Sequence, residues 1–208
     1  MDPKGTLEIY ADIWCPFAHV GLRAAVAQRA RCGREDTPFM IRAWPLELVN
    51  SAPMDPATTA AHVRDLREQV ALDLFAGFDE SDFPESTLPA LALADLAYRS
   101  SPATGEAVSL ALRDALFEEG RNIASPAVLE EIAVTYGVDI RTGLDVDAVR
   151  QDWRTGRERG VKGSPHFFCG GAEALCPSLD IERDQLGHLL LRRNADNVRA
   201  FLQGCFSA

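Results

Sequence analysis

The sequence predicts a mixed α/β fold of the α+β kind, in which strands and helices form a core that an all-helical segment interrupts. Three features predict it: a strand–turn–helix unit near the N-terminus, helical periodicity over most of residues 55–137, and two short strands around Gly170–Gly171. We expect residues 1–54 and 138–208 to form one discontinuous domain, with residues 55–137 inserted as a helical domain.

The first of these units begins with Thr6–Ala11, where β-favouring apolar residues alternate with polar ones. Cys15 follows at the junction between strand and helix, and Pro16 suits the first turn of a helix, where its missing N–H is not needed. Helical spacing of apolar residues then runs to Arg31, and Pro38–Trp44 has the composition of a second strand.

The helical segment opens with Asp55 as a predicted cap and Pro56 at the first helical position. A loop over Gly77–Ser86 interrupts it. Further helices are expected at Leu88–Arg99, at Glu106–Glu119 and from Pro126 to Tyr136.

After this segment we expect a helix from Asp145 to Arg159, with acids in its first turn and arginines in its last. Two strands, His166–Cys169 and Ala172–Cys176, should pair as a hairpin. Leucines, valine and phenylalanine over about Arg183–Gln203 predict a final helix.

Composition disfavours several functional classes. The net charge of −10 makes a surface that repels phosphates, so we expect no nucleic-acid partner. No stretch reaches membrane-spanning length, and the N-terminus lacks a basic segment followed by a long apolar run. We therefore expect a cytoplasmic protein without a membrane partner.

The five cysteines are spread over the whole chain, and their odd number predicts at least one free thiol. Cys169 and Cys176 would lie on opposite arms of the hairpin, but in a reducing compartment we expect both to be unpaired. Cys32 and Cys205 are interpreted as structural or incidental. No C-x-x-C pair occurs and the four histidines form no zinc-like spacing with the cysteines, so no metal is expected.

Two motifs in this order, WCPFA after the first strand and GVKGSPHFF before the hairpin, resemble the DsbA-like thioredoxin superfamily. The cytoplasmic branch looks closest, with polyketide-associated DsbA-like oxidoreductases, 2-hydroxychromene-2-carboxylate isomerases and, as neighbours, kappa-class glutathione transferases. The resemblance covers nearly the whole chain and implies a thioredoxin-like fold with a helical insertion.

Cys15 is the candidate catalytic residue. A thiol at a helix N-terminus lies near unpaired N–H groups that stabilise a thiolate, so we expect a depressed pKa. The alternative is a small buried apolar side chain. By resemblance Cys15 is the attacking cysteine, but Ala18 stands where dithiol relatives have their resolving cysteine. An internal C-x-x-C disulfide cannot form, and monothiol exchange with a low-molecular-weight thiol follows.

Pro165 corresponds by resemblance to the family's cis-proline, with Ser164 as the residue whose backbone is left free to pair with substrate. A trans proline that starts an edge strand is the alternative. The expected substrate-binding set is completed by residues around the thiol and at the exit of the second strand: Trp14, Pro16, Phe17 and Asn50. Trp14, Phe17 and Trp44 could rim an apolar substrate cleft, but aromatics at such positions are more often ordinary core, which we favour for Phe17.

His19 lies one helical turn beyond Cys15, where its imidazole could modulate the thiolate; an exposed or capping role is equally compatible. His166 would alternate with Phe167 along its strand and point away from the cleft.

Three functions fit these residues. The leading hypothesis is a monothiol thiol–disulfide oxidoreductase whose substrate is a small thiol or disulfide, with glutathione or a bacterial equivalent such as mycothiol as co-substrate and no permanently bound cofactor. The second is a thiol-dependent isomerase or kappa-class-like S-transferase. The third is a redox-inactive binding scaffold, which the alanine at position 18 favours. A homodimer is compatible with each.

Overall fold

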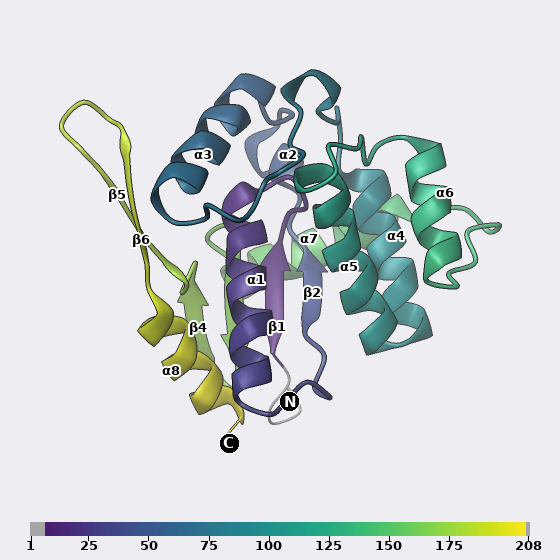
Figure 1. Cartoon of the computed structure of the whole chain (residues 1–208). Coiled ribbons are helices and arrows are strands. Elements are labelled where there is room, and N and C mark those ends of the chain that lie inside the picture. Colours follow the sequence, from purple (N-terminus) through teal and green to yellow (C-terminus); the bar gives the residue numbers. More distant parts are fainter. Residues whose placement is uncertain (1–6, 207–208) are drawn as a thin grey trace.

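The computed structural model describes residues 7–206 and is built around a four-stranded sheet (Figure 1). Its order is β2 (Met40–Ala43), β1 (Glu8–Ala11), β3 (His166–Cys169) and β4 (Ala172–Leu175). β1 is parallel to β2 and antiparallel to β3, and β3 is antiparallel to β4. The chain therefore leaves β1, β2 and β4 at the same edge of the sheet at which it enters β3.

The two faces of the sheet carry different layers, as alternation of side chains along the strands requires. Ile9 and Phe167, which are partners in the register of β1 with β3, are both fully buried. They lie in a cluster with apolar residues of α1 (Pro16–Arg31) and α8 (Ala195–Phe206). The cluster on the opposite face consists of Tyr10, Trp44 and Phe168, and Trp153 of α7 (Val146–Arg159) packs against it. Figure 1 shows α1 over one face of the sheet and α7 behind the other.

Helix α1 (Pro16–Arg31) begins where the sequence predicts. Cys15 is its N-cap in an extended conformation, Pro16 occupies the first turn, and Arg29 and Arg31 lie in the last turn, where cations complement the helix dipole. The start of α1 therefore lies at the sheet edge described above.

A run of helices lies between β2 and β3, and the predicted cap at Asp55 is confirmed. The Asp55 carboxylate accepts a hydrogen bond from the N–H of Thr58 at 2.8 Å, and Asp145 caps the last of these helices in the same way. The helices between β2 and β3 are α2 (Leu46–Asn50), α3 (Pro56–Gln69), the 3-10 helix η1 (Glu80–Asp82), α4 (Leu88–Ser100), α5 (Pro102–Phe117), α6 (Pro126–Thr135) and α7 (Val146–Arg159).

The predicted final helix over about 183–203 is wrong in its first half. Residues 179–193 form a β-hairpin, β5 (Leu179–Arg183) and β6 (Leu189–Arg193), and α8 is confined to Ala195–Phe206. The Asp184 carboxylate accepts two backbone N–H groups in the turn, and Gly187 adopts a positive φ of 87°. Along β6, burial alternates with a period of two, which is the pattern of a strand, although the close spacing of the leucines is also compatible with a helix.

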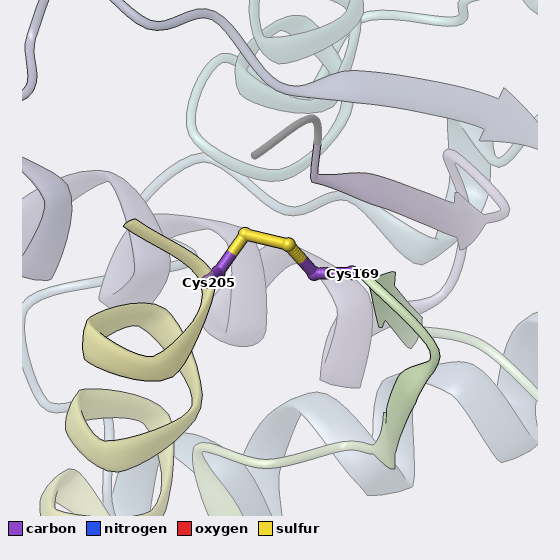
Figure 2. The surroundings of a disulfide bond; sticks show 2 residues. All are labelled: Cys169 and Cys205. Carbon is purple, nitrogen blue, oxygen red and sulfur yellow. A yellow bond between two sulfur atoms is a disulfide. The ribbon is translucent and has the colours of Figure 1, made fainter. Parts of the chain in front are cut away.

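A disulfide corrects the expectation that Cys169 is unpaired and Cys205 incidental. Cys169, the last residue of β3, is bonded to Cys205 in the last turn of α8 (Figure 2). The two cysteines are 36 residues apart, and only the packing of α8 beside β3 brings them together. Cys176 carries a free thiol, as predicted.

Within residues 7–206, no helix combines the length and the apolar character that crossing a bilayer requires. The longest helices, α1 and α5, have 16 residues each.

Candidate thiol site at the start of helix α1

Cys15 lies at the junction of β1 and α1, facing the turn that leads into β3. Its Sγ atom donates a hydrogen bond to the carbonyl oxygen of Ser164 at a distance of 3.2 Å. The Ser164–Pro165 peptide bond is cis, as the resemblance implied. The thiol and the proline-bearing turn, 149 residues apart in the chain, are thus neighbours.

Burial sets the protonation of this thiol. Only 4% of Cys15 is exposed, and desolvation raises its pKa above the ordinary value. Hydrogen bonds with Ser164 and with the N–H groups of Ala18 and Phe17 act in the opposite direction but are smaller. The expected depressed pKa is therefore wrong, because the loss of water around the anion outweighs the effect of the helix terminus.

Asp12 is a residue of the site that the sequence analysis missed. Its carboxyl group is fully buried, and desolvation raises its pKa to about 6. One oxygen accepts the N–H of Ile13 at 2.7 Å and the other accepts the N–H of Leu46. Its negative charge adds to the rise in the pKa of Cys15. An acid three residues before the cysteine, at the end of an apolar strand, was the available signal.

Arg113 is the cation that accompanies this buried acid. It is 1% exposed and donates to the backbone carbonyl of Asp12 at 3.2 Å and to Ser109 on its own helix. Burial lowers its pKa to about 10, and the charge of Asp12 partly opposes that shift. The end of β1 therefore carries two charged groups that are shielded from solvent. Removal of Asp12 or Arg113 would leave the charge of the other buried without its partner.

The Ser164–Pro165 turn is held from three sides. The N–H of Asp12 donates to Ser164 Oγ at 2.9 Å, and the N–H of Cys176 donates to the carbonyl of Pro165 at 2.9 Å. Gly21 of α1 packs on the proline ring so closely that a Cβ there would lie 3.0 Å from Pro165 Cγ. The turn is thereby fixed relative to both the sheet and α1.

The remaining predicted substrate-binding residues lie in different places. Pro16 is buried in the first turn of α1 next to the thiol, and Phe17 is half-buried with its ring 5.3 Å from that of His62. Trp14 is fully buried and stacks on Phe83 at 5.8 Å, so it is a core residue and does not line the rim of a cleft. Asn50 ends α2 and is exposed, and among the described contacts none joins it to Cys15.

His19 points to the helical insertion. Its Nε2 atom lies 2.6 Å from an oxygen of Glu118, and its ring packs against Phe75 and Phe117. Burial lowers the pKa of its ring, and the hydrogen bond and charge of Glu118 partly oppose that shift. The structure thus joins His19 to Glu118, and the expected position beside the thiolate is not observed.

His166 is buried in β3, and its Nδ1 atom accepts the backbone N–H of Lys162 at 3.2 Å. Its ring packs against Phe168 at 4.3 Å. This side chain supports the loop that precedes Pro165.

Ala18 occupies the position of the second thiol of a C-x-x-C motif, and its methyl group is fully buried in α1. The free thiols of the chain are Cys15, Cys32 at the far end of α1, and Cys176 after β4. In the described part of the chain, no three histidine, cysteine or acidic side chains are grouped as a metal site. The chemistry that this arrangement supports is that of a thiol.

A cavity of about 330 Å³ runs along α1 toward this site. Residues of α1, β6 and α8 line it, and Ser178 lies at its wall. Ser178 Oγ would be 3.4 Å from a Cβ at Gly21, beside the proline ring. The cavity therefore comes close to Pro165, although neither Pro165 nor Cys15 lines it.

Comparison with solved structures places the fold among known ones. A probable DsbA oxidoreductase from Streptomyces coelicolor is 21% identical, with a TM-score of 0.67 over 97% of this chain and 90% of that one. A 2-hydroxychromene-2-carboxylate isomerase is 14% identical, with a TM-score of 0.58 over 81% and 87%.

The cytosolic disulfide reductase DsbM from Pseudomonas aeruginosa is 18% identical, with a TM-score of 0.55 over 96% of this chain and 97% of that one. Its complex with glutathione aligns equally well, with a TM-score of 0.56. At these identities the likeness shows the fold, a thioredoxin-like one with a helical insertion between strands.

Among curated proteins, none matches the chain. The model of the DSBA-like thioredoxin domain matches residues 6–185, which is most of the sequence. The chain therefore belongs to the DSBA-like thioredoxin domain family.

Proposed function

We propose that this protein is a thiol–disulfide oxidoreductase in which Cys15 is the attacking sulfur and a low-molecular-weight thiol is the co-substrate. The observation that carries this proposal is the 3.2 Å hydrogen bond from Cys15 Sγ to the Ser164 carbonyl. It puts the sulfur beside backbone with which an extended substrate can pair. A disulfide bound along that backbone would lie next to the thiol.

The first step is a disulfide exchange. The Cys15 thiolate attacks one sulfur of the substrate disulfide, the other sulfur leaves as a thiolate, and a mixed disulfide forms on Cys15. Because position 18 is alanine, the C-x-x-C route to resolution is closed. An external thiol, glutathione or a bacterial equivalent such as mycothiol, attacks the mixed disulfide and regenerates Cys15.

Glutathione is supported by the neighbour that was solved with it, the cytosolic disulfide reductase DsbM. The compartment we propose is the cytoplasm, where small thiols keep protein thiols reduced.

Burial limits the rate of the first step. The raised pKa leaves most of Cys15 protonated near neutral pH, and the thiolate is the nucleophile. Attack therefore requires loss of the proton that Sγ shares with the Ser164 carbonyl. Exchange should accelerate with pH until the thiol is ionised.

The test is incubation of the full chain with glutathione disulfide, followed by alkylation and peptide mapping under non-reducing conditions. We expect a glutathione adduct on Cys15, or a disulfide derived from it, and neither in Cys15→Ser. Cys32→Ser is the matched control, because Cys32 is also free but lies at the opposite end of α1. Adducts distributed over Cys32 with none on Cys15 would refute the proposal and would favour a redox-inactive scaffold.

A thiol-dependent isomerase or S-transferase is the second candidate, and one observation favours it. A buried thiol with a raised pKa is a neutral hydrogen-bond donor, which suits the orientation of a bound small thiol that itself attacks an electrophilic carbon. The similarity to an isomerase fold is in keeping with this role.

Cys15→Ser separates the two functions. A serine hydroxyl donates the same hydrogen bond but forms no disulfide. Loss of exchange with retention of glutathione conjugation to a chlorodinitrobenzene-type electrophile would establish the second function. Loss of exchange with no conjugation in either protein supports the first.

A further inference from the structure

A second free thiol borders the Ser164–Pro165 turn, on the side opposite Cys15. β3 lies between β1 and β4 and is antiparallel to both, so β1 and β4 end at the edge where β3 begins. Cys15 follows the end of β1, and Cys176 is the first residue after β4. Two thiols that are far apart in sequence therefore flank one turn.

Hydrogen bonds tie both cysteines to consecutive carbonyl groups of that turn. Cys15 Sγ donates to the carbonyl of Ser164 at 3.2 Å, and the backbone N–H of Cys176 donates to the carbonyl of Pro165 at 2.9 Å. Cys176 is half-buried. Burial raises its pKa to about 12, and the charge of a Cys15 thiolate adds to the rise, so the two sulfurs lie within electrostatic reach of each other.

The backbone at Cys176 is unusual. Its φ is +47°, a left-handed conformation that disfavours residues with a Cβ. Two residues later, Ser178 is 4% exposed and its Oγ has no hydrogen-bond partner within residues 7–206. A buried hydroxyl with an unused donor beside Pro165 can stabilise a thiolate that forms at this turn.

We propose that Cys176 is the resolving thiol of Cys15, and that it supplies from the end of β4 the second sulfur that the alanine at position 18 removes from α1. This inference rests on the proposed function, because it requires the mixed disulfide on Cys15. It changes the second step: Cys176 resolves the mixed disulfide, and the external thiol acts afterwards.

The reaction balances with a disulfide substrate RSSR and two equivalents of small thiol. Cys15 attacks RSSR, which releases one RSH and leaves Cys15–S–SR. Cys176 then attacks Cys15 Sγ, the second RS⁻ leaves with the proton that Cys176 loses, and a Cys15–Cys176 disulfide forms. Two small thiols reduce this disulfide to two protein thiols and are themselves oxidised to one disulfide.

The distance between β1 and β4 predicts that the attack of Cys176 on the mixed disulfide requires a movement of the backbone. The backbones of β1 and β4 are two strand spacings apart, roughly 10 Å, whereas the Cα atoms of a disulfide are about 4.4–6.8 Å apart. The turn after β4 must therefore move toward α1. This movement breaks the hydrogen bond from the Cys176 N–H to the Pro165 carbonyl and displaces the buried segment 177–179. Resolution should be slower than the first exchange and should accelerate as Cys176 ionises.

The experiment uses the full chain and glutathione disulfide as the probe, with alkylation at timed intervals and non-reducing peptide mapping. In the wild type we expect a cross-linked peptide pair that contains Cys15 and Cys176. In Cys176→Ser and Cys176→Ala we expect a Cys15–glutathione adduct that persists at least ~10-fold longer. Cys32→Ser should behave as the wild type, and circular dichroism of each variant checks that it is folded.

The outcomes separate the two proposals. Equal accumulation of the Cys15 adduct in wild type and both Cys176 variants, without the cross-link, overturns the role of Cys176 and leaves the proposed function intact. No modification of Cys15 in any of the proteins overturns the proposed function itself. If a Cys176 variant fails to fold, the cross-link in the wild type and in Cys32→Ser still decides the question.

Discussion

Cys15 Sγ donates a hydrogen bond to the carbonyl oxygen of Ser164, and this contact joins the start of α1 to the turn before β3. Burial keeps this thiol protonated, because desolvation raises its pKa more than the hydrogen bonds with Ser164, Ala18 and Phe17 lower it. In the exchange proposed above, a substrate disulfide that pairs with this backbone would lie beside the sulfur.

The first prediction concerns the ionisation of Cys15. Burial raises its pKa, so we expect alkylation of Cys15 by iodoacetamide to have its midpoint above the unperturbed value of about 8.5. Mass spectrometry that follows Cys15 alone as a function of pH makes the measurement. A midpoint near pH 6 or 7 would show that the helix terminus outweighs desolvation.

The second prediction concerns the charge of Asp12. Because its carboxylate raises the pKa of Cys15, Asp12→Asn should lower the alkylation midpoint of Cys15. Asp196→Asn is a suitable control, since this exposed acid in the first turn of α8 lies on a different element. An unchanged midpoint in Asp12→Asn would mean that this carboxylate exerts no electrostatic effect on the thiol.

A third prediction follows from the pKa of Asp12, about 6 in the folded protein against about 3.9 in an unfolded chain. Between these values the folded state binds more protons, so stability falls as pH rises from about 4 to about 6, by roughly 3 kcal/mol for this group. Asp12→Asn should flatten this part of the stability curve in urea unfolding. The same dependence of stability on pH in the wild type and in Asp12→Asn would contradict the raised pKa of Asp12.

The position of the thiol was predictable from a local signal, because a cysteine followed by proline after a β-favouring run places it at a helix start. The cis peptide bond at Ser164–Pro165 was predicted only by the family resemblance. The burial of Cys15 was not predictable from these signals. The burial of Cys15 depends on the packing of α1 on the sheet and on the contact of the thiol with the turn before β3. Both are contacts between distant parts of the chain.

Two errors have the same physical origin. The leucines between 186 and 191 fit a helix locally. The segment nevertheless forms a hairpin, because Asp184 and Gly187 form its turn and β5 pairs with β6. Likewise Cys169 and Cys205 carry no pairing signal in sequence, and only tertiary packing joins them. The predicted limits of the inserted domain, 55–137, stay a prediction.

The fourth prediction concerns the contact between α1 and the proline ring. Gly21→Ala places a methyl group 3.0 Å from Pro165 Cγ, so the ring or the helix must shift. We expect a loss of about 1–3 kcal/mol in stability and slower modification of Cys15. Gly204→Ala in α8 is the control: its Cβ would meet nothing within 4 Å, and the better helix propensity should stabilise the protein by up to ~1 kcal/mol. Unfolding and alkylation rates of both variants make the comparison.

A fifth prediction concerns the disulfide that fastens α8 to β3 (Figure 2). Closing a loop of 36 residues restricts the unfolded chain, which corresponds to about 3–4 kcal/mol of stability. Cys205→Ser should lose that amount in denaturant unfolding. Because Cys205 lies away from Cys15 in the fold, Cys15 of this variant should still exchange with glutathione disulfide at denaturant concentrations below the unfolding midpoint.

The most direct test of the account is turnover of a glutathionylated peptide by reduced glutathione, measured with the full chain, Cys15→Ser and Cys32→Ser. If Cys15 is the attacking sulfur, Cys15→Ser should lose at least ~100-fold in kcat/KM while Cys32→Ser stays within about twofold of the wild type. Turnover by Cys15→Ser at the wild-type rate would contradict the role assigned to Cys15.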